Sequence, residues 1–165
     1  MQQVGNHLAD VAILSTDTVE IDLFGRSAVN RYYYACFLET RRAVTLIHPT
    51  LEIKHKQLPQ NLRSTIARIV RAEIGRAEKA RLISSLDAGS SRVLLNRVVS
   101  ELAEVLEKSY KLRVIADYQP ELRVVRQAGH RVLDGNSSTD IRDWYRRVAR
   151  NVARITKLWK DLGHA

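Results

Sequence analysis

Arginine side chains recur every four residues along the segment 138–161, which makes this segment well suited to bind an anion. Residues four apart lie on the same side of a helix, and the row consists of Arg142, Arg146, Arg150 and Arg154. Carboxylates at the same spacing, which would pair with the arginines on a merely solvated surface, are few. Because neighbouring like charges cost stability, a polyanionic partner explains the row better than a solvated surface does.

The opposite side of this segment is apolar, and it predicts the helix that carries the row. At 100° per residue, one arc collects Ile141, Trp144, Tyr145, Val148, Val152, Ile155 and Trp159. Ser137 and Asp140 have the spacing of a weak capping box, which would start the helix. The pattern predicts an amphipathic helix with its arginines turned away from a core.

A second polar group stands at the end of a predicted helix over 90–117, where Arg113, Asp117 and Tyr118 follow one another. Arg113 and Asp117 have the i,i+4 spacing of a helical ion pair, and we favour that pairing. A functional arginine would instead direct its planar guanidinium into a groove, where it can hold a phosphate. The tyrosine hydroxyl is the third candidate group of this site.

The segment 122–136 breaks the helical pattern and carries further cations. Short β-branched runs stand on either side of Ala128-Gly129, so the segment is either a basic hairpin or a mobile loop. Its candidate residues are Arg123 and Arg126 for nucleic-acid binding, and His130 for acid–base chemistry.

Helical periodicity dominates the remaining chain, and it predicts an all-α fold, an antiparallel bundle of four to five helices in a single domain over residues 1–165. The helices are expected at about 2–15, 26–47, 58–85, 90–117 and 138–161. Pro49 and Pro120 end two of them, because a residue before proline avoids helical dihedrals. Gly75 is a candidate break within the third helix, and Gly89 with its neighbouring serines is expected to close it.

The net charge of +9 is the strongest global indication of a partner. Residues 1–25 contain four acidic residues and no Lys or Arg, so the rest of the chain is more basic than the total suggests. A field of this sign favours RNA, DNA or an acidic protein. The alternative is a surface whose charge serves solubility.

Several classes of site find no support in the sequence. No metal-ligand cluster, Gly-rich phosphate loop or nucleophile elbow occurs, so no metal or cofactor is expected. The single cysteine, Cys36, stands among aromatic residues and is expected to be an inert core residue rather than a nucleophile. Without a signal peptide or a long apolar stretch, we expect a cytoplasmic protein with no membrane segment.

Three motifs follow one another in the chain. The second helix contains Arg31-Tyr32-Tyr33-Tyr34-Ala35-Cys36-Phe37, His55 stands where a third helix opens, and the fourth helix ends in Arg113-Val114-Ile115-Ala116-Asp117-Tyr118. Together they cover roughly residues 20–160, and they resemble the R-x-Y-Y-A-x-F and R-x-x-A-D-Y motifs of the HEPN superfamily. These are helical nucleic-acid-handling domains of prokaryotic defence and toxin systems.

The resemblance implies a helical bundle that dimerises. In active members, an R-x4-6-H motif from each protomer cuts RNA without a metal: the arginine holds the phosphate and the histidine serves as acid or base. This chain departs from that pattern, because Tyr118 stands at the histidine position and tyrosine is a poor base at neutral pH. His130, which follows Arg123 at x6 spacing, and His55 are the histidines that remain, and a structural or surface role is expected for both.

The expected function is therefore a HEPN-like module of a defence or toxin–antitoxin system that binds RNA, nucleotide or a partner protein without the family's usual catalysis. The alternative is a metal-independent ribonuclease or toxin with a composite site at the dimer interface. A structural bundle that serves an acidic partner is a more remote hypothesis. The expected partners are RNA or another nucleic acid and a second chain, in a homodimer or in a heterodimer with a related helical or nucleotidyltransferase-type protein.

Overall fold

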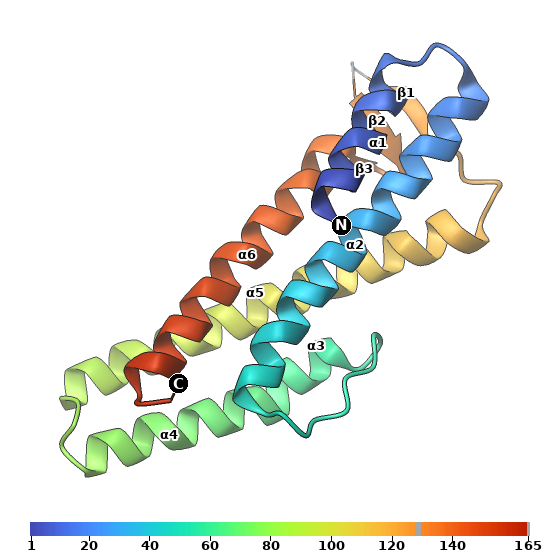
Figure 1. The fold of residues 1–165 in the computed structure, drawn as a ribbon. Helices are drawn as coiled ribbons and strands as arrows, with labels where there is room; N and C mark the ends of the chain where they lie inside the picture. The colour runs from blue at the N-terminus through green and yellow to red at the C-terminus, as the bar shows by residue number, and fades with distance from the viewer. Residues whose placement is uncertain (128–129, 165) are drawn as a thin grey trace. The chain divides into compact units, whose positions relative to one another are not determined.

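The chain is mainly helical, as the computed structural model in Figure 1 shows for residues 1–127 and 130–164. Its helices are α1 (Gln2–Leu14), α2 (Thr18–Ile47), α3 (Leu58–Asn61), the π-helical turn η1 (Leu62–Ile66), α4 (Ala67–Lys79), α5 (Ser85–Tyr118) and α6 (Ser138–Asp161). The segments α3, η1 and α4 follow one another without interruption. These helices confirm the predicted all-α class and helical bundle. None of the helices among the described residues is long and apolar enough to cross a membrane.

Two compact units make up the chain. The first unit contains Met1–Leu38 and Val105–Arg146, and the second contains Glu39–Glu104 and Arg147–Ala165. The boundaries fall inside α2, α5 and α6, so each of these helices contributes one part to each unit. The prediction of a single domain stays a prediction.

A small antiparallel sheet belongs to the first unit. Its strands are β1 (Val125–Gln127), β2 (His130–Leu133) and β3 (Asn136–Ser137), in the order β1-β2-β3. Val132 of β2 pairs with Val125 on one side and with Ser137 on the other. Asp134 and Gly135 between β2 and β3 both have positive φ, at 47° and 73°, which is the geometry of the tight turns favoured in hairpins. Three short strands thus lie between Val125 and Ser137, largely within the predicted segment 122–136, while Ala128-Gly129 lies outside the described residues.

The aromatic motif of α2 supplies much of the first unit's core. Tyr32, Tyr33 and Phe37 are all at most 3% exposed, and the hydroxyl of Tyr32 donates a hydrogen bond to Asn6 of α1 at 2.6 Å. Cys36 is fully buried beside them, and burial raises the pKa of its thiol to about 12. The thiol therefore stays protonated at neutral pH, and its burial confirms that Cys36 is a core residue.

The start of α2 lies eight residues before the predicted one, at Thr18 rather than residue 26. Asp17 supplies the cap that starts the helix, since its carboxylate accepts hydrogen bonds from the backbone N–H groups of Val19 at 2.6 Å and Glu20 at 3.3 Å. Gly25 then continues the helix. Its missing side chain leaves room for Val124, whose methyl carbons would lie 2.9 Å from a Cβ at that position.

In the second unit, α4 and the first part of α5 lie side by side (Figure 1), joined by Arg71–Asn96 and Arg92–Glu78 contacts. The predicted breaks at Gly75 and Gly89 were wrong, because both residues lie inside helices. The chain turns instead at Arg81, which takes a left-handed φ of 58° and lets Leu82 N–H bond the carbonyl of Ala77 at 2.9 Å. A following serine then caps α5 at its first turn.

Candidate functional site

Arg113 and Asp117 form the ion pair that their spacing predicts, one turn apart on α5. Their charged groups are 2.7 Å apart, and the side chains are 21% and 24% exposed. Burial acts to lower the pKa of the Arg113 guanidinium, but the charge of Asp117 and the hydroxyl of Tyr118 outweigh burial and raise it. Arg113 is therefore a permanently charged group that is partly withdrawn from water.

Asn30 of α2 completes this site, although the sequence analysis did not select it. Its amide N–H donates to Asp117 Oδ1 at 2.6 Å, while Arg113 binds the other carboxylate oxygen. With both oxygens engaged, Asp117 holds the amide and the guanidinium side by side. Two buried polar atoms of this site have no hydrogen-bond partner within the described residues, Nε of Arg113 and Oδ1 of Asn30. Both atoms lie beneath the surface of the site.

One tyrosine ring packs against the guanidinium, and further tyrosines lie near it. The Cζ atom of Arg113 lies over the ring of Tyr118, 5.5 Å from its centroid, in a cation–π contact. Tyr33 packs edge-on against Tyr34 and Tyr110, with ring centroids 5.4 and 5.8 Å apart. Tyr33 is buried, whereas Tyr118 is 68% exposed. The site is therefore a half-buried cation with one solvent-exposed ring against it and a cluster of tyrosines around the buried Tyr33 nearby.

Arg26 of α2 fixes the end of α5 that carries this site. Its guanidinium donates to the backbone carbonyls of Ala116 at 2.9 Å and Gln119 at 3.0 Å, and also to those of Ile115 and Leu122. Its Nε binds Asp22 at 2.9 Å, and the same Asp22 oxygen accepts the N–H of Val124 at 2.8 Å. The last carbonyls of a helix have no partner within the helix, and here one arginine satisfies several of them. We call this set of contacts the Arg26 clasp.

The candidate site residues predicted in segment 122–136 lie on the surface of the first unit. Arg123, Arg126 and His130 are all exposed. The imidazole Nδ1 of His130 lies 3.3 Å from the hydroxyl of Thr139. His130 is not among the residues that contact Arg113 in the described part of the chain, so the structure does not bring the two predicted catalytic residues together within one protomer.

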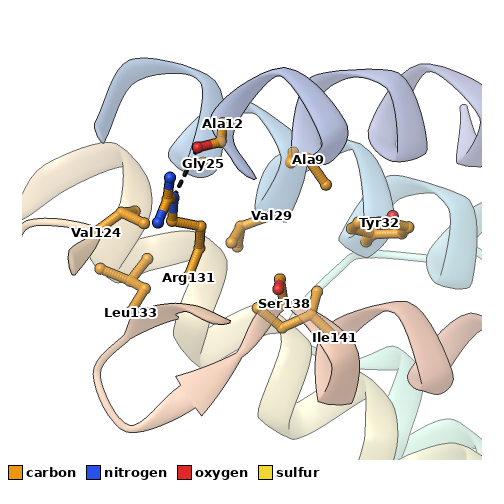
Figure 2. A pocket seen from close by; sticks show the side chains of 11 residues that line it. Ala9, Ala12, Gly25, Val29, Tyr32, Val124, Arg131, Leu133, Ser138 and Ile141 are labelled. Carbon is orange, nitrogen blue, oxygen red and sulfur yellow. Dashed lines mark hydrogen bonds between the residues drawn. The ribbon is translucent and has the colours of Figure 1, made fainter. Parts of the chain in front are cut away.

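Arg131 of β2 points inward instead, and no prediction had identified it. It is 4% exposed and donates to the carbonyls at the end of α1, to Ala12 at 2.7 Å and to Ile13 at 2.9 Å; Figure 2 shows the first of these bonds. Burial, with a contribution from Arg126, lowers the pKa of Arg131. The cavity in Figure 2 has about 20 Å³, enough for one water. Because Arg131 is already satisfied there, we read its role as capping α1.

The arginines of α6 do not form one uniform row. Arg142 binds Asp10 at 2.8 Å, and its Nε donates to the Tyr32 hydroxyl at 3.3 Å, so this arginine belongs to the packing of the first unit. Arg146 in the first unit and Arg150 and Arg154 in the second make no ion pair within the described residues. Of the four predicted arginines, only Arg146, Arg150 and Arg154 therefore remain without an ion pair in the described part of the chain.

The capping box predicted for α6 is confirmed. The backbone N–H of Ser137 donates to the Asp140 carboxylate at 3.2 Å, and the Ser137 hydroxyl accepts the Asp140 N–H at the same distance.

The described residues contain no group of three or more side chains placed to hold a metal.

Comparison with known proteins adds no relative. No protein-family model, curated protein or solved structure matches this chain.

Proposed function

We propose that this chain is a HEPN-like module of a prokaryotic defence or toxin–antitoxin system, and that it binds RNA or nucleotide at Arg113 without the family's usual catalysis. The observation that carries the proposal is the state of this arginine. It is charged and held by Asp117 and Tyr118, and its side chain is still 21% exposed. A fixed guanidinium that solvent can still reach is suited to recognise a phosphate.

The distribution of charge supports a polyanion as the partner. The formal net charge is +9, and part of it resides in exposed arginines that form no ion pair in the described residues. Arg123, Arg126 and Arg146 are such residues in the first unit, which also holds Arg113. Cations of this kind attract any phosphate backbone and make binding depend on salt.

The absence of a histidine at the motif position argues for binding rather than cleavage. Tyr118 stands at that position, next to Asp117, and its ring packs against the arginine. General acid–base catalysis near neutral pH needs a group that both accepts and releases a proton there, and tyrosine is poorly matched to that task. We further propose that the chain acts in the cytoplasm. We also propose that it forms a homodimer, or a heterodimer with a related helical or nucleotidyltransferase-type chain. Sedimentation at micromolar concentration would detect the dimer.

Arg113→Ala tests the proposal, with Arg97→Ala as its matched control. Both arginines lie on α5, and each pairs with a carboxylate four residues later. Arg97 is 67% exposed, however, whereas Arg113 is 21% exposed. Both variants lose one positive charge, so a difference between them measures the site rather than the overall field.

We expect Arg113→Ala to weaken binding of a labelled oligoribonucleotide at least tenfold and Arg97→Ala to weaken it only by the general charge effect. Equal losses in the two variants would refute Arg113 as the binding group. Incubation of the wild-type chain with the RNA in the presence of a chelator tests the other half of the proposal. Metal-independent cleavage that Tyr118→Phe abolishes would establish the ribonuclease instead.

A further inference from the structure

The exposed ring beside Arg113 is unusual in this chain. Most of its aromatic side chains are buried or half-buried, and Tyr118 is the one aromatic residue among the strongly exposed large hydrophobic side chains of the described residues, at 68% exposure. Leaving such a ring in water forgoes the burial of a large apolar surface. A ligand that covers the ring would recover that surface.

The ring of Tyr118 is also held in place, although it is exposed. Arg113 lies over it at 5.5 Å, and Arg113 is fixed in turn by Asp117 and thereby by Asn30. The backbone directly after the ring is fixed too, because the carbonyl of Gln119 accepts a hydrogen bond from Arg26 at 3.0 Å. A ligand that packs on this ring therefore loses little freedom of the protein, which favours binding.

A cation next to an open aromatic face matches two parts of a nucleotide. The guanidinium is complementary to the phosphate, and the free face of the ring is complementary to the base, which stacks on aromatic side chains whatever its sequence. In a duplex the bases stack on one another and their faces are covered, so a ring on a protein surface reaches only bases that are unpaired. A site that combines the Arg113 guanidinium with the Tyr118 ring should therefore favour unpaired nucleic acid over a duplex.

We propose that Tyr118 is a stacking platform for an unpaired base, and that the site accordingly takes single-stranded nucleic acid in preference to a duplex. This inference rests on the proposed function, since it assumes that Arg113 holds a phosphate. It adds the Tyr118 ring as a second recognition element and single-stranded nucleic acid as the preferred ligand. Stacking uses the ring of Tyr118, while its hydroxyl acts on Arg113, so a phenylalanine at this position should keep the preference for unpaired bases.

The test compares three probes of the same length by fluorescence anisotropy: a single-stranded oligoribonucleotide, a duplex, and an abasic strand that keeps the phosphates and lacks the bases. The variants are Tyr118→Leu, which removes the ring but stays apolar, and Tyr118→Phe, which keeps the ring. Leu14→Ala is the control, since Leu14 is an exposed apolar residue on α1 at 82% exposure. Thermal unfolding of each variant shows that it is folded.

The wild-type chain and Tyr118→Phe should bind the single strand more tightly than the duplex or the abasic strand. Tyr118→Leu should lose about five- to 150-fold in affinity for the single strand, the range measured for one stacked base, and should no longer distinguish it from the abasic strand. If Tyr118→Leu binds like the wild type while Arg113→Ala loses binding, stacking is refuted and the proposed function stands. If the wild type binds none of the three probes, both are refuted.

Discussion

Removal of the Arg26 clasp should destabilise the first unit far more than loss of an ordinary surface arginine. The side chain of Arg26 is 13% exposed and that of its partner Asp22 is 23% exposed. In Arg26→Ala, the carbonyls of Ala116 and Gln119 lose their donor at the end of α5. Asp22 loses its cation in the same change, while still bonded to the backbone of the hairpin.

The size of the effect follows from these contacts. A hydrogen bond to a charged group contributes about 1.5–3 kcal/mol, but the bonds of one guanidinium are not additive. Breaking a buried ion pair on one side costs about 3–5 kcal/mol, and we take the lower part of that range because Asp22 is partly hydrated. At about 2–4 °C per kcal/mol for a chain of this size, Tm should fall by roughly 6–15 °C. The Tm of Arg26→Lys should lie between those of the wild type and Arg26→Ala. A lysine keeps the charge, but its ammonium cannot span the same carbonyls.

Thermal unfolding followed by circular dichroism measures the effect, with Arg42→Ala as the control. Arg42 also pairs with a carboxylate on α2 but is 77% exposed, so its loss should leave Tm nearly unchanged. A drop in Arg26→Ala no larger than in Arg42→Ala would refute the role assigned to the clasp. RNA binding by Arg26→Ala below its Tm should also be reduced, because the clasp holds the turn that carries the site.

The remaining predictions concern single positions. Gly25→Ala should destabilise the protein by about 1–3 kcal/mol, because its new methyl would lie 2.9 Å from Val124. Gly75→Ala should raise stability by about 0.5–1 kcal/mol, because nothing lies within 4 Å of the new methyl. The Tm of each variant measures the effect. Cys36 should resist a thiol reagent in the native protein and react once the chain is unfolded, because burial raises its pKa to about 12; rapid native labelling would contradict the burial. Hydrogen bonds from Asn151 and Arg97 lower the pKa of Glu101 from 4.5, so its contribution to stability is present above that pH and is lost as the pH falls through the lower folded value. Glu101→Gln should therefore make chemical denaturation midpoints less dependent on pH in the acid range.

Features with a local signature were predictable from the sequence. The i,i+4 pair of Arg113 and Asp117, and the cap of α6 by Ser137 and Asp140, both depend on spacing along one helix. Both form as expected. Arg142 shows where this kind of reasoning stops, because its spacing places it in the arginine row while Asp10, at the other end of the first unit's sequence, engages it.

The contacts that complete the site were not predictable in this way. Asn30 and Asp117 are 87 residues apart, and no spacing rule joins them. Arg26 and Arg131 bind backbone carbonyls, which every residue possesses, so the identity of the neighbouring residues gives no sign of the contact. The turn at Arg81 was missed for a related reason, since the chain adopts there a conformation for which glycine would be the usual signal.

The two capping arginines each join segments that are far apart in the sequence. Arg131 binds the carbonyl of Ala12, 119 residues earlier, and Arg26 binds that of Gln119, 93 residues later. During synthesis α1 emerges first, yet the donor for its last carbonyls emerges only when most of the chain has been made. Contacts of such sequence separation form slowly and late. Nascent chains that end before the hairpin should therefore carry an unfinished first unit, open to proteases and chaperones until β2 has left the ribosome.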